Sequence, residues 1–251
     1  MPALIRFSIF AMVAYSVAAT GQEAAPVRLR GVPELPIPKG ARYGVNKFDG
    51  LTYILVPAGK FHMGCSSRAG EDCSPLDESR EVTIERSFWI GQTEVTQGAY
   101  FRVMGTNPMS HGGALLPVDS VTVYNAEEYC EKVGMRLPDD DEWEYAARAG
   151  TTGPRYGAVE DVAWYAKNAD YHTHEVGQKQ PNAWGLYDIF GNVGEWTAGV
   201  YARNKYDIMY KVYGGSWATA AEDIKFWSYT GVLHSVSNRY IGFRCVGISN
   251  Q

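Results

Sequence analysis

The sequence predicts an α+β fold that is rich in loops, with small antiparallel sheets and few helices. Three observations lead to this class. Glycine makes up 27 of the 251 residues, about 11% against a usual ~7%. The chain also carries 17 tyrosines and 7 tryptophans. Helical spacing is confined to the part before Gly150, and the stretch from there to Gly247 shows little of it. Glycine-rich turns and amphipathic rings together favour loops that aromatic side chains hold in place.

Residues 1–19 have the pattern of an export signal. Arg6 supplies the positive charge, residues 7–14 form an apolar run, and the small residues of Val17-Ala18-Ala19 precede a cleavage site at Thr20. The run is too short to span a bilayer, and no other stretch is long and apolar enough. We therefore expect a secreted or periplasmic protein with no membrane span. The alternative is a frayed apolar N-terminus.

Charge narrows the range of partners. Removal of residues 1–19 takes away Arg6 alone and changes the net charge from −5 to −6. A negative protein gains nothing from counterion release on nucleic acid or from attraction to anionic lipid. Neither nucleic acid nor an anionic membrane is therefore expected as a partner.

Residues 20–47 are predicted to form a Pro-rich leader or linker, and residues 48–251 the domain. The leader carries four prolines and little periodicity. The segment LTYILVPAGKFHMG alternates like a hairpin with its turn at Pro57-Ala58-Gly59, and REVTIERSFWIGQTEV predicts a further pair of short strands.

Three helices are predicted next. In TQGAYFRVMG, Thr96 can cap the start and Gly105 the end. VYNAEEYCEKVG places Cys130 on a second helix that stops at Gly134. In RLPDDDEWEYAARAG, Asp139 can accept from the first-turn amides, and the acids that follow it suit the positive end of the helix dipole. We interpret this acidic run as a helix start; the alternative is a metal site.

The four cysteines are expected to form two disulfides, because an exported protein meets an oxidising compartment. Four cysteines allow three pairings. Cys65 and Cys73 are close in sequence, which leaves Cys130 with Cys245 across a loop of more than 100 residues. Closing such a loop stabilises a protein by roughly 4–5 kcal/mol in chain-entropy estimates. The alternative is a free, reactive thiol at Cys245.

Seven motifs occur in the order and rough spacing seen in the formylglycine-generating enzyme family, the sulfatase-modifying factors. They are VPAGKFHMG, SFWIGQTEVTQGAYFRVMG, LPVDSVTVYNAEEYC, RLPDDDEWEYAARAG, NAWGLYDIFGNVGEW, YGGSW and IGFRC. The resemblance covers Leu51 to Val246 and implies a variant C-type-lectin-like fold. It also implies a disulfide from the second helix to the GFRC cysteine, which matches the pairing of Cys130 with Cys245.

The resemblance stops at the reactive centre. Family members that make formylglycine use two cysteines between GGSW and GFRC to bind copper(I), activate oxygen and oxidise a substrate cysteine to an aldehyde. Soft thiolates suit that ion. No cysteine lies between Ala218 and Arg244, so neither copper nor formylglycine generation is expected here. The family motif GNVWEW reads GNVGEW in this chain, and Gly194 is predicted to open space in the substrate pocket.

The resemblance implies one structural calcium ion. Its matching ligands are Asp188, Gly191, Val193 and Glu195, and carboxylates with backbone carbonyls are the hard oxygen donors that calcium prefers. The alternative is a capped turn with two solvated acids. The loop NADYHTHEVG is too short for the family's other calcium site. Its two histidines, His172 and His174, make an incomplete metal site, and we interpret them as part of a surface loop.

Function is predicted at the level of a class. The resemblance implies a divergent, non-copper enzyme that oxidises or otherwise tailors a peptide-like substrate, similar to exported relatives without the cysteine pair that act in siderophore maturation. The substrate cleft is expected to be bounded by Trp184, Gly194, Trp196, Trp217 and Trp227. The catalytic residues are unknown, and the polar candidates are Ser216, Ser228, Tyr229, His234 and Arg239. The alternatives are a non-catalytic lectin-like module of the envelope that binds a peptide-like molecule or a protein, and a structural envelope protein.

Overall fold

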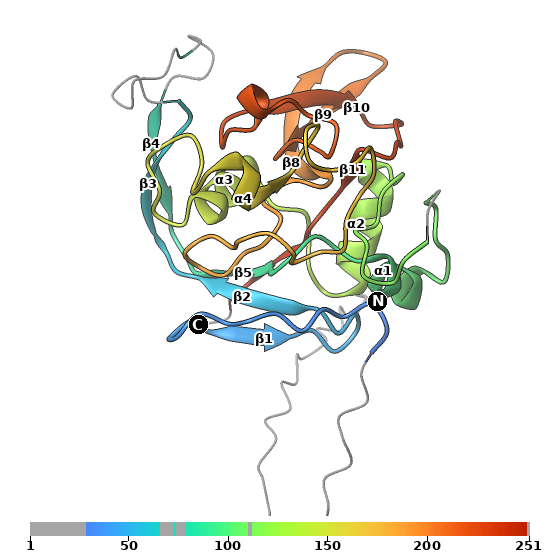
Figure 1. Ribbon diagram of the computed structural model, residues 1–251. Helices are drawn as coiled ribbons and strands as arrows, with labels where there is room; N and C mark the ends of the chain where they lie inside the picture. The colour runs from blue at the N-terminus through green and yellow to red at the C-terminus, as the bar shows by residue number, and fades with distance from the viewer. Residues whose placement is uncertain (1–28, 66–72, 74–78, 110–111, 250–251) are drawn as a thin grey trace, which may run out of the picture.

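Two four-stranded sheets form the frame of the protein (Figure 1). The computed structural model describes residues 29–65, 73, 79–109 and 112–249, and the predicted export signal lies outside them. The first sheet has the order β1 (Tyr43–Val45), β2 (Thr52–Val56), β5 (Phe88–Gly91), β12 (Val246–Ile248), and all its neighbours are antiparallel. The second has the order β10 (Tyr229–Leu233), β9 (Ile208–Tyr213), β8 (Gly194–Arg203), β11 (Ile241–Gly242), with β11 parallel to β8.

Smaller elements complete the described part of the fold. Two-stranded pairs are β3 (Gly59–Met63) with β4 (Arg80–Ile84), and β6 (Ala163–Trp164) with β7 (Phe190–Gly191). The helices are α1 (Gln97–Met104), α2 (Val123–Lys132), α3 (Asp140–Arg148) and the single turn α4 (Val159–Val162). Figure 1 shows the first sheet along the bottom, the second at the top, and long loops with α3 and α4 between them. The predicted loop-rich α+β class is confirmed.

Capping residues fix the ends of the helices as predicted. The Thr96 hydroxyl accepts from the amide of the third helical residue of α1, and Gly105 ends that helix in the left-handed conformation, with φ of 73°. Asp139 and Glu142 form a reciprocal capping box at α3. The acidic run is therefore a helix start. Its acids also have basic partners, since Arg80 pairs with Asp141 at 2.6 Å.

The described part of the leader packs on the domain. Arg102 donates to the carbonyl of Arg30 at 2.6 Å, the Gln92 amide donates to the carbonyl of Pro36 at 3.1 Å, and β1 extends the first sheet. Pro-rich sequence makes this segment extended, but its carbonyls and β1 find partners on the domain. Packing therefore begins before the predicted boundary at residue 48, in contrast to a free tether.

The predicted hairpin at Pro57-Ala58-Gly59 is wrong. Strand β2 pairs with β1 and β5, and β3 pairs with β4, so the turn carries the chain from one sheet into another. The reason lies in the leader, because β1 takes the edge of β2 that a hairpin partner would need. Gly59 sits where the chain passes Tyr145; a Cβ there would lie 2.4 Å from the tyrosine hydroxyl.

Both predicted disulfides are confirmed. Cys65 bonds to Cys73, and Cys130 bonds to Cys245 across 115 residues of sequence. The longer bridge lies in the apolar cluster beside Tyr129 and joins α2 to the end of the chain. In the part of the chain that the structure describes, no helix is both long and apolar enough to cross a membrane.

We expect the two bridges to differ in their effect on stability. Closing 115 residues should contribute about 5 kcal/mol to the free energy of unfolding and closing 8 residues about 2.5 kcal/mol, because a longer loop loses more entropy in the unfolded chain. Chemical unfolding of Cys130→Ala/Cys245→Ala against Cys65→Ala/Cys73→Ala measures this difference. Equal losses, or a free thiol in the oxidised mature protein, would contradict the assignment.

Candidate functional site

A buried asparagine joins four segments of the chain. The amide of Asn192 donates to the carbonyl of Trp164 at 2.8 Å, and its carbonyl accepts from the amide of Trp217 at 2.9 Å. Its side-chain Nδ2 donates to Glu94 Oε2 at 2.9 Å, while its Oδ1 accepts from the amide of His174 at 2.9 Å. Asn192 is fully buried in the left-handed conformation, with φ of 54°. It thereby fixes the relative positions of loops that are far apart in sequence.

An ion pair lies in the same buried region. Arg244 donates to Glu195 through Nε, at 2.7 and 2.9 Å from the two carboxylate oxygens, and through a terminal nitrogen at 2.6 Å. Arg244 is 0% exposed and Glu195 is 1% exposed. The same guanidinium donates to the carbonyls of Gly91 at 3.0 Å and Tyr187 at 2.9 Å. Arg244 therefore ties β5 to the loop that precedes β7.

Glu195 is engaged by protein donors on both of its oxygens. A carboxylate offers about four acceptor positions. Arg244 approaches with two N–H groups, Nε–H shared between the two oxygens and a terminal N–H on Oε1, and the Trp143 indole N–H donates to Oε2 at 2.7 Å. A calcium ion bound through this carboxylate would have to stand beside the guanidinium or displace it. The arrangement therefore does not favour calcium at Glu195, and the four-ligand calcium site stays a prediction.

The buried region nevertheless carries surplus negative charge. Glu94, Asp188 and Glu195 face one guanidinium, that of Arg244. Burial raises the pKa of Glu94 well above its ordinary value, and Asp188 and Glu195 raise it further. Burial also raises the pKa of Asp188 to about 6. Asp188 accepts from the Gly177 amide at 2.6 Å through Oδ2, whereas Oδ1 has no partner among the described residues. Protons retained by the Glu94 and Asp188 carboxyl groups therefore offset part of this negative charge.

Trp164, whose carbonyl accepts from the Asn192 amide, stacks with a histidine ring and a lysine ammonium. The Trp164 ring lies between the His174 ring, at 3.7 Å between centroids, and Lys179 Nζ, at 4.0 Å from the centroid. His172 lies next to His174, at 4.5 Å between ring centroids. The Trp164 indole nitrogen is buried and has no partner in the described part of the protein.

A second stack is attached through Trp217. The Arg239 guanidinium lies 4.8 Å from the Trp217 ring centroid, and the Tyr240 ring is 4.9 Å from it. The Trp217 indole donates to the carbonyl of Arg239 at 3.1 Å. Arg239 is exposed whereas Trp217 is 4% exposed, so the cation covers the ring and faces solvent.

Among the described residues, those expected to bound a substrate cleft lie in different surroundings. Trp196 is fully buried and donates to the carbonyl of Val121 at 3.0 Å, which makes it part of the core. The space expected at Gly194 is filled, because a Cβ there would lie 2.7 Å from a methyl of Val212. Trp227 is 8% exposed and lies in the apolar cluster that contains Phe190 and Phe226. Trp217 belongs to the stack with Arg239 and Tyr240.

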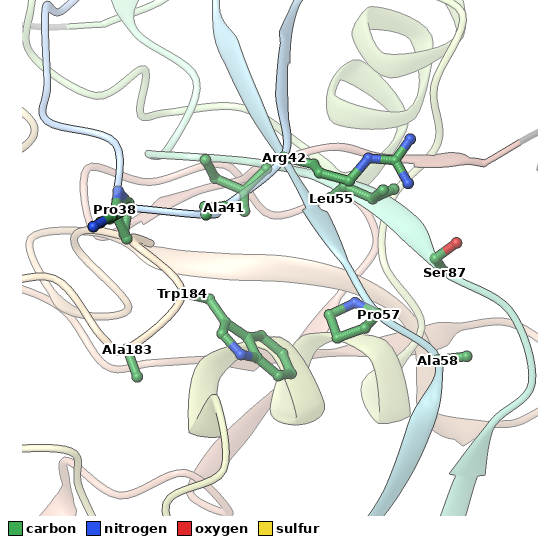
Figure 2. A pocket seen from close by; sticks show the side chains of 12 residues that line it. Pro38, Ala41, Arg42, Leu55, Pro57, Ala58, Ser87, Ala183 and Trp184 are labelled. Atoms are coloured by element: carbon green, nitrogen blue, oxygen red, sulfur yellow. The ribbon is translucent and has the colours of Figure 1, made fainter.

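Trp184 lines a separate groove of about 530 Å³ (Figure 2). Pro38 and Ala41 of the leader form one side of this groove, and Leu55 and Pro57 another. Tyr145 supports the Trp184 ring at 5.0 Å between centroids. None of the residues bonded to Asn192 lines this groove, so it is a different place on the protein.

The polar candidates are dispersed. Ser216 and Arg239 lie near Asn192, where the Ser216 hydroxyl is 3.4 Å from that of Thr219. Tyr229 packs on Tyr213 at 5.4 Å between ring centroids, with Lys211 above it at 4.5 Å. His234 lies beside Tyr124 at 5.3 Å. Ser228 donates its amide to the carbonyl of Lys225 at 3.1 Å. No hydrogen bond joins any two of the five candidates in the described residues.

Three residues that shape the site were not predicted from the sequence. Glu94 and Asn192 stand inside the motifs TEV and GNV, where a polar residue directly before a valine is a signal for a buried partner. Trp164 carries no comparable signal, because only the fold brings Lys179 and His174 to its two faces.

Known proteins match the chain over most of its described length. The family model for the sulfatase-modifying factor enzyme 1-like domain matches residues 44–248. The chaperone protein LppX of Paenibacillus barcinonensis is 30% identical over 204 residues, which cover 57% of this chain and 69% of LppX. The inactive C-alpha-formylglycine-generating enzyme 2 of Mus musculus is 32% identical over 156 residues, which cover 54% of this chain and 50% of that protein. This chain thus spans half of the mouse relative.

A solved structure shares the fold. PvdO from Pseudomonas aeruginosa superposes with a TM-score of 0.74 at 22% identity, over 83% of this chain and 98% of that one. At this identity the likeness concerns the fold alone. Together with the family match, it confirms the predicted fold and the predicted family resemblance.

We expect loss of Arg244 to be far more damaging than loss of an exposed arginine at an equally short ion pair. Arg244→Met leaves Glu195 buried and charged, which should cost about 3–5 kcal/mol of unfolding free energy. Arg80→Met breaks the ion pair with Asp141, which has the same length of 2.6 Å. The side chains of Arg80 and Asp141 are 58% and 39% exposed, so a loss of about 0–1 kcal/mol of unfolding free energy is expected. Urea unfolding compares them, and similar losses would contradict a central role for Arg244.

Asp188 should make stability depend on pH. Its pKa is about 6 in the folded protein and near the ordinary 3.8 when unfolded, so the folded state holds the proton more tightly. The resulting stabilisation is complete below pH 3.8 and is lost as the pH rises through about 6. Asp188→Asn has no carboxyl proton to lose. Its free energy of unfolding should therefore rise relative to that of the natural protein as the pH increases from 3.8 to about 6. Parallel unfolding profiles would contradict this, and Asp161→Asn, at an exposed acid, is the control.

Proposed function

Because the chain belongs to the sulfatase-modifying factor enzyme 1-like domain family, we propose that it is an exported member that tailors a peptide-like substrate without copper-dependent formylglycine chemistry. One observation carries this proposal. All four cysteines are bonded in the disulfides Cys65–Cys73 and Cys130–Cys245. A disulfide sulfur is not a thiolate, and copper(I) needs soft thiolate donors of the kind the family's reactive pair supplies. The mouse relative is named an inactive formylglycine-generating enzyme, which is in keeping with the absence of formylglycine chemistry proposed here.

The groups around Asn192 form the site we assign to the substrate. Arg239 presents an exposed guanidinium over Trp217, and Lys179 presents a partly buried ammonium over Trp164. Both cations stand on a protein whose net charge is −5. Guanidinium groups bind carboxylates through two parallel hydrogen bonds. A peptide-like substrate with acidic groups therefore suits this surface.

A second candidate function is a binding module without chemistry. The dispersal of Ser216, Ser228, Tyr229, His234 and Arg239 favours it, because a general base must lie within hydrogen-bond reach of the group it deprotonates. LppX is named a chaperone protein, which is in keeping with this candidate. Both candidates use the same surface and differ in whether the bound peptide changes.

The first arm of the test concerns formylglycine. The mature protein, supplied with copper(I), oxygen and a cysteine peptide of the sulfatase type, should form no aldehyde, because its cysteines are held in disulfides. Carbonyl-specific labelling followed by mass spectrometry of the peptide detects the product. Aldehyde formation by the fully oxidised protein would overturn the proposal.

The second arm concerns the substrate. Fluorescent peptides rich in aspartate should bind more tightly than the same peptides with lysine in place of aspartate. Arg239→Gln should weaken binding about tenfold, which corresponds to the loss of one charge-assisted hydrogen bond. Arg203→Gln, at an exposed arginine of β8, is the matched control. Binding indifferent to peptide charge and to Arg239 would contradict the assigned surface.

The recovered peptide then separates the two candidates. After aerobic incubation with the protein, a change in peptide mass that needs Arg239 supports a tailoring enzyme. Unchanged mass with Arg239-dependent binding supports the binding module.

A further inference from the structure

The two histidines of one loop each have a ring nitrogen fixed by a backbone carbonyl. His172 Nδ1 lies 2.9 Å from the carbonyl of Thr173, and His174 Nε2 lies 3.1 Å from the carbonyl of Ala169. A carbonyl oxygen only accepts, so each of these nitrogens carries the proton in the neutral ring. The other nitrogens, His172 Nε2 and His174 Nδ1, are then left with bare lone pairs. Metal-binding histidines are oriented in this way, with one nitrogen donating to a carbonyl and the other free for the metal.

The two rings are close together, and one is held firmly. Their centroids are 4.5 Å apart with 40° between the ring planes. His174 stacks on Trp164 at 3.7 Å between centroids, and its amide donates to Asn192 Oδ1. His172 is exposed. One ligand is thus fixed by the buried scaffold, and the other is accessible to solvent and to an incoming ion.

The chain leading into the histidines is strained. Asp170 and Tyr171 are consecutive residues in the left-handed region, with φ of 49° and 64°. Neither is a glycine, so the surrounding contacts must impose this conformation, and such strain concentrates at functional sites. Tyr171 is 85% exposed and gains no burial in return. These two residues directly precede His172 in the chain.

We propose that His172 Nε2 and His174 Nδ1 bind one divalent transition-metal ion of the kind that imidazole prefers, with copper(II) and zinc the strongest candidates. No third histidine, cysteine or acid joins them within the described residues, so the remaining positions belong to water or to a bound ligand. This site is separate from the thiolate copper(I) chemistry of the family and uses no cysteine. It stands whether or not the proposed function is right, because it needs only the two imidazoles.

Copper(II) titration of tag-free mature protein tests the site. One equivalent should bind and quench tryptophan fluorescence, because Trp164 stacks directly on His174. The electron paramagnetic resonance spectrum should show nitrogen ligands. His172→Ala should weaken binding about 10–100-fold, since even the loss of an outer-shell partner has an effect of that size. His62→Ala, at an exposed histidine of β3, is the matched control and should bind as the natural protein does.

Two further variants keep the test independent of folding. Trp164→Phe should retain the stoichiometry and lose most of the quenching, which locates the ion beside that ring. His172→Gln should weaken binding like His172→Ala with an unchanged melting temperature, because the side chain is exposed. The proposal is overturned if no equivalent binds, if His172→Ala and His62→Ala bind equally, or if both weaken binding to the same extent.

Discussion

The buried contact between Arg244 and Glu195 determines how the loops of this protein are arranged. The Arg244 guanidinium reaches β5 at Gly91 and the loop at Tyr187, and Glu195 is the second residue of β8. Cys245 follows directly and bonds to α2. Two adjacent residues therefore link both sheets and a helix. Such contacts hold the long loops around them in one conformation, because each buried carbonyl in a loop needs a donor.

The contact between Arg244 and Glu195 also differs from what the family motifs alone imply for Glu195. Glu195 stands in the position of a calcium ligand by family resemblance, yet both of its oxygens accept from Arg244 or Trp143. Cysteine chemistry is absent for a parallel reason, since every sulfur of a cysteine is in a disulfide. The scaffold of the family is kept, and the groups that face solvent at Asn192 are cations, rings and histidines. Function in such a protein follows from these surface groups rather than from the fold.

The sequence predicts the local structure well and the site poorly, for physical reasons. Capping boxes and C-cap glycines are local, so α1 and α3 could be placed within a residue or two. The disulfides followed from spacing and family resemblance. The β2–β3 hairpin failed because β1, a distant segment, competes for the same edge. The pocket expected at Gly194 failed because Val212, from the neighbouring strand, fills it. Long-range packing of this kind leaves no mark in a short window of sequence.

A crystal structure of the mature protein grown with calcium in excess tests the central claim most directly. The account predicts that the Arg244 guanidinium remains hydrogen-bonded to both oxygens of Glu195, with no ion between that carboxylate and Asp188. An anomalous peak from a calcium ion bound to Glu195, with Arg244 turned away to other partners, would contradict it.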